Sequence, residues 1–330
     1  MANQETGPIA FEQLVGQSAL AARLRAALGQ GRVAHAVIIA GPRGSGKRTL
    51  AAIYARALVC RGEGPKPCNA CPSCRKALGG NHPDLHAVRP EGEGKSFGVD
   101  EARGILRLID LKPYEGGRAV VVLEQAHAMT TQAQNALLKT LEEPPEHVAL
   151  ILLAESLSPL LPTILSRCAL LQMRKLNSRE MAEVLKRHGQ ADGEHARHAA
   201  AMADGSPGRA LELLQDESYW TLRDRAMAAL EQLVNGKKLA EAMKFAQESR
   251  NRADDVLTVW ECAIRDAAVR ASGARSGLLT GDAKAYLKNL GPEALERRLG
   301  ACEQARRDLE GNAVYTMTMD RLLIELAGGI

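Results

Sequence analysis

Residues 40–50, AGPRGSGKRTL, combine the glycines and the lysine of a phosphate-binding loop. In the pattern G-x-x-x-x-G-K, backbone amides surround the phosphates and the lysine pairs with β- and γ-phosphate oxygens. The next residue should carry a hydroxyl for Mg²⁺, but it is Arg48, whose guanidinium has no lone pair and repels a metal ion. An ordinary glycine-rich turn is the alternative. We expect a degenerate nucleotide loop that does not hydrolyse ATP, built from Gly41, Gly44, Gly46, Lys47 and, one position too late for the metal, Thr49. Whether ATP or ADP still binds to it is left open by the sequence.

A second set of catalytic groups is expected where the apolar run VVVLEQAHAM (120–129) turns polar. An ATPase carries two acids there, one for Mg²⁺ and one that polarises the attacking water. This chain has Glu124 followed by Gln125, and an amide has no useful basicity. Taken alone, the run also fits a strand end with incidental polar residues. Together with the loop, it predicts that water activation is lost.

Four cysteines follow the loop at the spacing C-x7-C-x2-C-x2-C, namely Cys60, Cys68, Cys71 and Cys74. Four thiolates complete the tetrahedral shell of zinc and leave no position for water, so the spacing predicts a structural Zn²⁺ site. Free thiols are the alternative, which the clustering disfavours. We expect the other three cysteines, Cys168, Cys262 and Cys302, to be core residues.

The segment LPTILSRC (161–168) places Pro162 at the start of a predicted short helix and Arg167 at its end. A surface arginine is usually only solvated. An arginine at such an edge can instead complete the phosphate site of a neighbouring subunit in trans, where it stabilises the charge of phosphoryl transfer.

Apolar runs that alternate with helical patterns predict an α/β domain with a parallel sheet and helices on both faces. The expected strands are 35–40, 84–90, 118–124, 148–155 and 169–176. Beyond them the pattern is helical, and Asn177 with Glu180 forms a capping-box signature. We expect three domains: a sheet domain at 1–172 with the cysteine module at 60–74, a small helical domain at 173–213 and a larger helical domain at 214–330.

Composition limits the classes of partner. The 330 residues carry a net charge of only +4, and 3% are aromatic, so a basic groove lined with base-stacking rings is not indicated. No run approaches the roughly 18 apolar residues of a membrane span, and the first residues lack the layout of a secretion signal. We expect no membrane association and a cytoplasmic protein.

Several motifs, taken in order, resemble bacterial DNA polymerase III clamp-loader subunits of the AAA+ class. They are VGQ (15–17), the four cysteines, HPD (82–84), NALLKTLEEPPEH (135–147) and SRC (166–168), and the resemblance covers most of residues 11–210. It implies an AAA+ P-loop domain, a helical lid and an all-α collar domain that holds a five-membered ring. The family contains ATP-hydrolysing gamma or tau subunits and a stator subunit, delta prime, which keeps an arginine finger but has a degraded ATP site.

Three departures favour the stator type. Arg48 replaces a Mg²⁺-binding threonine, Gln125 replaces the catalytic glutamate, and Gly208 stands where active members carry a phosphate-sensing arginine, with Arg209 displaced by one. The resemblance then implies that Arg167, with Ser166, reaches the ATP of an adjacent subunit. It implies gamma or tau and delta as partners in a hetero-pentamer, with the sliding clamp and primed DNA engaged through the complex. An ATP-hydrolysing gamma/tau-type subunit and a zinc-dependent DNA-binding module are the alternatives.

Overall fold

The computed structural model describes residues 10–90, 96–115, 117–189, 193–236, 238–273, 280, 284–311 and 313–328. The chain divides into two compact units, Met1–Glu180 and Met181–Ile330. The sheet lies in the first unit, as predicted, and the second unit is helical. The finer division into three domains, with boundaries at residues 172 and 213, stays a prediction.

The N-terminal unit is built on a five-stranded parallel sheet in the order β2-β3-β4-β1-β5. The strands confirm all five predicted positions. β1 and β3 are rich in the β-branched residues that favour extended backbone, whereas β5 contains none. Their bounds are β1 (Ala36–Ala40), β2 (Leu85–Val88), β3 (Ala119–Leu123), β4 (Val148–Ala154) and β5 (Ala169–Gln172).

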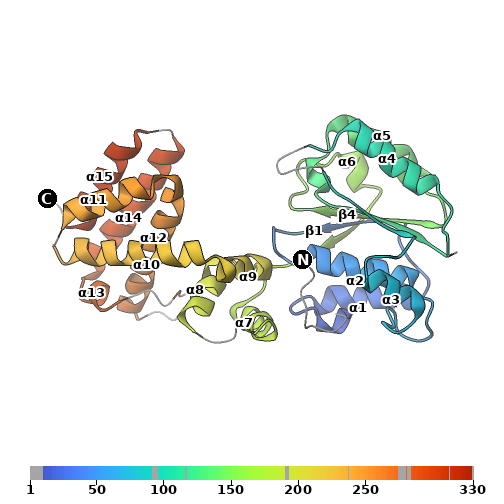
Figure 1. The fold of residues 1–330 in the computed structure, drawn as a ribbon, viewed down its shortest axis with the longest axis horizontal. Coiled ribbons are helices and arrows are strands. Elements are labelled where there is room, and N and C mark those ends of the chain that lie inside the picture. Colours follow the sequence, from blue (N-terminus) through green and yellow to red (C-terminus); the bar gives the residue numbers. More distant parts are fainter. Residues whose placement is uncertain are drawn as a thin grey trace. The chain divides into compact units, whose positions relative to one another are not determined.

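Helices cover both faces of this sheet (Figure 1). In β1, the side chains of Val37 and Ile39 pack on one face, and those of Ala36 and Ile38 pack on the other. Both sets are buried, which explains why the strands read as continuous apolar runs. One layer holds α1 (Ser18–Gly29), α2 (Lys47–Val59) and α3 (Pro72–Leu78), and the other holds α4 (Val99–Asp110), α5 (Thr131–Glu142) and α6 (Pro162–Leu165).

The parallel arrangement gives the sheet two chemically different edges. Gly41 directly follows β1 and Glu124 directly follows β3, so both lie at the carboxyl edge of the sheet. Arg167 precedes β5, whose first residue, Ala169, is paired with Val37 near the start of β1. Arg167 therefore lies at the amino edge.

The C-terminal unit has its own core around the fully buried Trp260, whose indole Nε1 donates to the Ala226 carbonyl at 2.8 Å. The predicted capping box at the start of α7, the helix at the boundary of the two units, is confirmed, because the Asn177 and Glu180 side chains each accept from the other's backbone N–H at 3.0 Å. The sequence SGARSG (272–277), which predicts a break between helices, lies partly outside the described residues. The helices are α7 (Ser178–Arg187), α8 (Glu194–Met202), α9 (Pro207–Gln215), α10 (Glu217–Val234), α11 (Leu239–Glu248), α12 (Ala253–Ala271), α13 (Ala285–Lys288), α14 (Pro292–Glu310) and α15 (Tyr315–Leu326).

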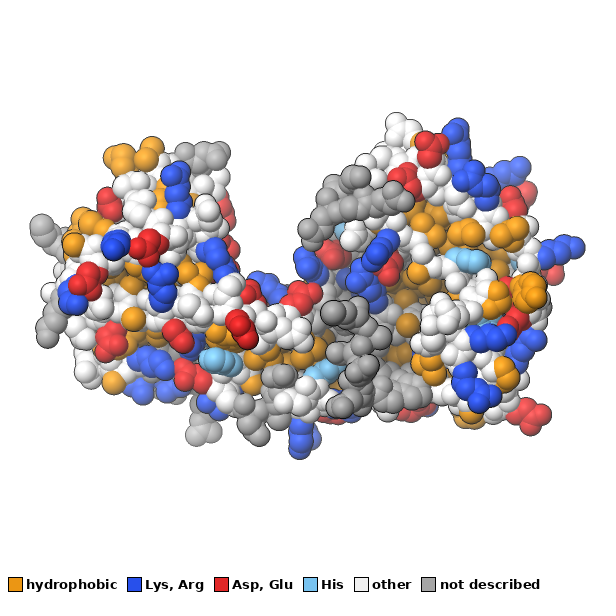
Figure 2. Space-filling model, in the orientation of Figure 1, with side chains coloured by type: hydrophobic (Ala, Val, Ile, Leu, Met, Phe, Trp, Pro, Cys, Tyr) orange, Lys and Arg blue, Asp and Glu red, His pale blue; other side chains and the backbone are white. Residues whose placement is uncertain are grey.

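On the face drawn in Figure 2, Lys and Arg side chains are interspersed with Asp and Glu side chains. This distribution agrees with the mild net charge of +4. Among the described helices, none is both long enough and apolar enough to cross a membrane. Cys262 and Cys302 are buried as predicted, whereas Cys168 is only partly buried.

Candidate functional site

The phosphate-loop pattern folds as the sequence predicts, between the end of β1 and the start of α2. Gly44 and Gly46 adopt φ angles of 73° and 91°, a left-handed conformation that favours glycine. Gly41 is required for space, because a Cβ there would lie 3.0 Å from Ser45 Oγ and 3.1 Å from Met173 Cβ. The loop therefore has the backbone of a phosphate cradle at a helix N-terminus.

Lys47 reaches back across the loop. Its ammonium donates to the carbonyls of Gly41 at 2.7 Å and Pro42 at 2.8 Å. Burial lowers the pKa of Lys47, while the nearby Glu155 carboxylate raises it and the Arg48 guanidinium lowers it. The loop thus holds a partly desolvated ammonium that a phosphate group could engage in place of the two carbonyls.

Arg48 and Glu124 form an ion pair, with Nη2 and Oε2 2.7 Å apart. The Arg48 side chain is 68% exposed, whereas that of Glu124 is 18% exposed. The Oε2 atom is buried and accepts no aligned hydrogen bond among the described residues, so the attraction is mainly that of the two charges. The sequence analysis treated Arg48 and Glu124 separately, but the structure pairs them. The Arg48 guanidinium faces the carboxylate that would bind Mg²⁺ in an ATPase.

Gln125 follows Glu124 at the carboxyl edge of the sheet, with a φ angle of 54°. A left-handed conformation is uncommon for a residue other than glycine and is found where surrounding structure enforces it. The position is therefore well defined by the fold, but its side chain is a carboxamide, which is not a general base.

Arg167 and the phosphate loop lie at opposite ends of the strands, so the length of a strand separates them. Ala169 and Gln172 lie at the two ends of β5, roughly 10 Å apart at a rise of about 3.3 Å per residue. Helix α6 starts at Pro162 as predicted and ends at Leu165, two residues before the arginine.

The guanidinium of Arg167 is held by three acceptors on its own unit. It donates to Glu142 Oε1 at 2.7 Å, to the Thr163 carbonyl at 3.0 Å and to Ser166 Oγ at 3.2 Å. Its side chain is 33% exposed, so part of it faces solvent. The structure brings the predicted pair Ser166 and Arg167 together, and it adds Glu142, which sequence did not single out.

The predicted lid position lies in the other unit. Ser206 precedes α9, and Gly208 and Arg209 fall in its first turn, where Arg209 is exposed. That Arg209 is displaced by one residue from the position of a phosphate-sensing arginine stays a prediction from the resemblance.

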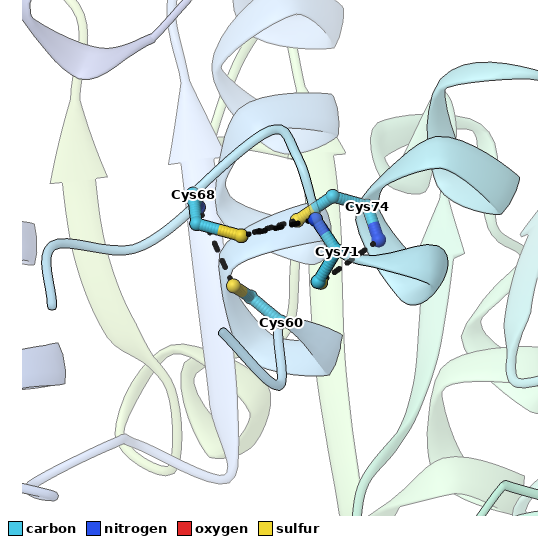
Figure 3. A group of neighbouring side chains, drawn as sticks. All are labelled: Cys60, Cys68, Cys71 and Cys74. Carbon is cyan, nitrogen blue, oxygen red and sulfur yellow. Dashed lines mark hydrogen bonds between the residues drawn. The ribbon is translucent and has the colours of Figure 1, made fainter. Parts of the chain in front are cut away.

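The four predicted metal-ligand cysteines converge in space (Figure 3). Cys60 follows α2 directly, Cys71 caps α3 and Cys74 lies in its first turn. Their sulfurs all lie within 4.8 Å of one another, and the sulfurs of Cys68 and Cys74 are 3.9 Å apart. Zinc bonds of about 2.3 Å in a tetrahedron separate sulfurs by about 3.8 Å, so the group has the dimensions of a four-thiolate metal site.

The surroundings of Cys68 and Cys71 lower the pKa of their thiols, whereas burial raises the pKa of the Cys74 thiol. Backbone N–H groups of Cys68, Cys71 and Cys74 donate to the sulfurs of Cys60, Cys68 and Cys71 at 3.3–3.4 Å. Burial raises the pKa of the Cys71 thiol, but the N–H donors and neighbouring thiols lower it to about 6. Burial lowers the pKa of Arg56, while the sulfurs of Cys74 and Cys60 raise it. A buried cation one helical turn before Cys60 fits the negative charge of a metal bound by four thiolates.

A buried group of polar side chains beside α3 has the composition of a hydrolytic triad but not its geometry. Ser73 Oγ lies 2.9 Å from His82 Nε2 and donates to Glu115 Oε2 at 3.1 Å. His82 Nδ1 accepts from the backbone N–H of Asp84 at 3.1 Å, so the imidazole proton must sit on Nε2. The histidine cannot then take a proton from Ser73, and the group is a structural tie between α3 and the segment around Glu115.

Sequence comparison finds similar proteins for the N-terminal half of the chain. Residues 16–177 match the family described as DNA polymerase III, delta subunit. The DNA polymerase III subunit delta' of Haemophilus influenzae is 37% identical over 182 residues, which cover 55% of each chain. That of Pseudomonas aeruginosa is 43% identical over 141 residues, which cover 42% of this chain and 43% of its relative. The chain thus spans about half the length of these relatives.

Proteins named as gamma or tau subunits are also similar. The DNA polymerase III subunit tau of Escherichia coli is 32% identical over 228 residues, 69% of this chain and 33% of its relative. Among solved structures, a gamma-subunit-related protein of Thermotoga maritima aligns with 92% of this chain and 98% of its own at 16% identity and a TM-score of 0.47. The family match and the two delta' relatives support a DNA polymerase III subunit of the delta' type, over the N-terminal half of the chain.

Proposed function

We propose that this chain is a stator subunit of a DNA polymerase III clamp loader. It hydrolyses no ATP itself and supplies Arg167 in trans to the ATP bound by an adjacent gamma or tau subunit. With gamma or tau and delta, it forms a hetero-pentamer that loads the sliding clamp on primed DNA. As part of the replication machinery, it works in the cytoplasm.

The observation that carries this proposal is the placement of Arg167 and the loop at opposite edges of one rigid sheet. Arg167 cannot reach its own loop, yet its guanidinium is presented at the surface with Ser166 beside it. An arginine that is to act on phosphate from this edge must act on a nucleotide held by another chain.

The ion pair at the carboxyl edge supports the loss of hydrolysis. Arg48 neutralises Glu124, and Gln125 offers no base for the attacking water. A gamma/tau-type subunit would need an acid available for Mg²⁺ at this point, so the geometry favours the stator type.

We also propose that the four cysteines hold a structural Zn²⁺. Four sulfurs of suitable spacing, three N–H···S bonds and a buried arginine nearby support it. A site closed by four thiolates has no position for water, so zinc would contribute to stability and not to chemistry.

The arginine finger is tested in the complex reconstituted with gamma or tau and delta. Arg167→Ala should lower DNA-stimulated ATP hydrolysis by about tenfold or more, with the ~10³–10⁵ that trans arginines supply elsewhere as the upper guide. Because the Arg167–Glu142 pair is partly exposed, the melting temperature should hardly change. Arg23→Ala, on the exposed face of α1, is the matched control and should behave as the wild type. Unchanged turnover with Arg167→Ala would remove the finger assignment.

A further inference from the structure

The arginine proposed to act in trans is already engaged within its own chain, by the carboxylate of Glu142. Arg167 Nη2 donates to Glu142 Oε1 at 2.7 Å, which is the shortest of the three hydrogen bonds of the guanidinium. The other two bonds go to uncharged oxygens, the Thr163 carbonyl and the Ser166 hydroxyl. Among the described residues, Glu142 is therefore the acid that neutralises Arg167.

Stability does not account for a carboxylate at this place. Glu142 is the last residue of α5, where the helix dipole favours a cation and disfavours an anion. The side chains of Arg167 and Glu142 are 33% and 49% exposed, and exposed ion pairs contribute about fivefold or less to an equilibrium constant. The pair is thus weak enough to open, and its effect is to be sought in what Arg167 does.

We propose that Glu142 is a positioning residue that holds Arg167 in a resting place and competes for it with the ATP phosphates of the adjacent subunit. This inference rests on the proposed action of Arg167 in trans. A guanidinium stabilises the charge of phosphoryl transfer through its own positive charge, and a paired carboxylate cancels that charge. Arg167 therefore has to leave Glu142 before it acts.

The exchange of partners follows from charge and exposure. A triphosphate carries more negative charge than one carboxylate, and its oxygens suit the planar fork of a guanidinium. Release leaves Glu142 in water, because its side chain is 49% exposed, so no unpaired charge becomes buried. The guanidinium is thus released when ATP is within reach and stays paired when it is not. Glu142 thereby restrains hydrolysis.

The test is DNA-stimulated ATP hydrolysis by the complex reconstituted with gamma or tau and delta. Glu142→Gln keeps the shape of the side chain and an acceptor for Arg167 but removes the charge. It should raise kcat/KM for ATP by about two- to fivefold, the range of an exposed ion pair. The ratio of variant to wild type should fall towards one between about 0.05 M and about 0.5 M salt, because salt screens the pair. Glu143→Gln removes the same charge from the adjacent exposed residue and should match the wild type.

A kcat/KM that falls in Glu142→Gln, or that equals the wild type at low salt, would overturn the inference. The gain should also vanish when Arg167→Ala is already present, and a gain that persists would show that Glu142 does not act through Arg167. Failure of the proposed function looks different, because Arg167→Ala alone would then leave hydrolysis unchanged. If Arg167→Ala lowers hydrolysis and Glu142→Gln does not raise it, only this inference fails.

Discussion

At the scale of single residues, the chain differs from an ATPase by the chemistry of a few side chains on a backbone that is otherwise suited to phosphate. Gly44 and Gly46 give the loop its left-handed turns, and Lys47 is in place. We therefore assign the proposed loss of hydrolysis to Arg48 and Gln125 and not to a distorted fold. The cysteine site also depends on a single residue, because a methyl group added at Gly62 would collide with Cys68.

Gly62 tests the cysteine site. A Cβ at this position would lie 2.5 Å from Cys68 Sγ and 3.0 Å from its Cβ, so Gly62→Ala must displace a ligand. We expect the wild type to carry about one zinc per chain and Gly62→Ala to carry much less after gel filtration, as measured by elemental analysis. Gly29→Ala, where a Cβ meets nothing within 4 Å, is the control. Wild-type protein without zinc, or full zinc in Gly62→Ala, would contradict this assignment.

At the scale of elements, side chains on or next to α5 and α3 fix the positions of neighbouring segments. Gln134 on α5 holds the segment before α6, and His82 ties α3 to the segment around Glu115. Gln134 on α5 is 1% exposed and bonds to both sides of the turn before α6. Its amide nitrogen donates to the Met129 carbonyl at 3.2 Å and the Pro159 carbonyl at 3.0 Å, and its oxygen accepts from the Leu161 N–H at 2.7 Å. The position of Arg167 therefore depends on a buried side chain in the preceding helix.

Gln134→Ala should lower the free energy of unfolding of the N-terminal unit by roughly 2–4 kcal/mol, because it leaves buried backbone groups without partners. It should also reduce DNA-stimulated ATP hydrolysis of the reconstituted complex, since the segment that carries Arg167 loses its support. Urea denaturation followed by fluorescence or circular dichroism gives the first quantity. Gln132→Ala, exposed on the same helix, should leave both unchanged. Equal free energies of unfolding for Gln134→Ala and Gln132→Ala would show that the hydrogen bonds of Gln134 do not stabilise this segment.

Helix α3 is tied to the segment around Glu115 through His82, which predicts a dependence on pH. Burial lowers the pKa of His82 below its ordinary value of 6.5, while Glu115 and Asp84 raise it. The unfolded chain therefore takes up the proton more readily, so stability is complete above the ordinary pKa and is lost as pH falls below it.

The melting temperature of the N-terminal unit should fall between about pH 7.5 and about pH 5.5, and the fall should be smaller in His82→Asn. Asparagine keeps an acceptor for the Asp84 N–H but does not titrate. His86→Asn, on the neighbouring strand β2, is the control for removing a histidine. A fall of the same size in His82→Asn and wild type would exclude His82 as its source.

At the scale of the whole molecule, the groups proposed to act on nucleotide, together with the cysteine site, lie in the N-terminal unit, and the family match covers the same region, residues 16–177. The C-terminal unit contributes a separate helical core around Trp260. Its proposed role as a collar, and the lid within it, rest on resemblance. For the whole molecule, the question to measure is whether the purified chain hydrolyses ATP by itself or only the complex that contains it does.

Much of this could be predicted from the sequence, because the strands are short apolar runs and the loop and the cysteines are local patterns. Contacts between distant segments could not. The pairing of Arg48 with Glu124 depends on β1 and β3 ending at the same edge, and the pairing of Arg167 with Glu142 depends on how α5 packs beside α6. The contact of Ser73 with His82 could not be predicted either. Its chemistry depends on which ring nitrogen of His82 accepts the hydrogen bond from the Asp84 N–H.

The most direct test of the central claim is phosphate release from ATP by the purified chain alone, in the presence of Mg²⁺. We predict a rate no higher than background and equal to that of Lys47→Ala, because the metal ligand is neutralised and the water has no base. Rapid release by the wild type that disappears in Lys47→Ala would contradict the account.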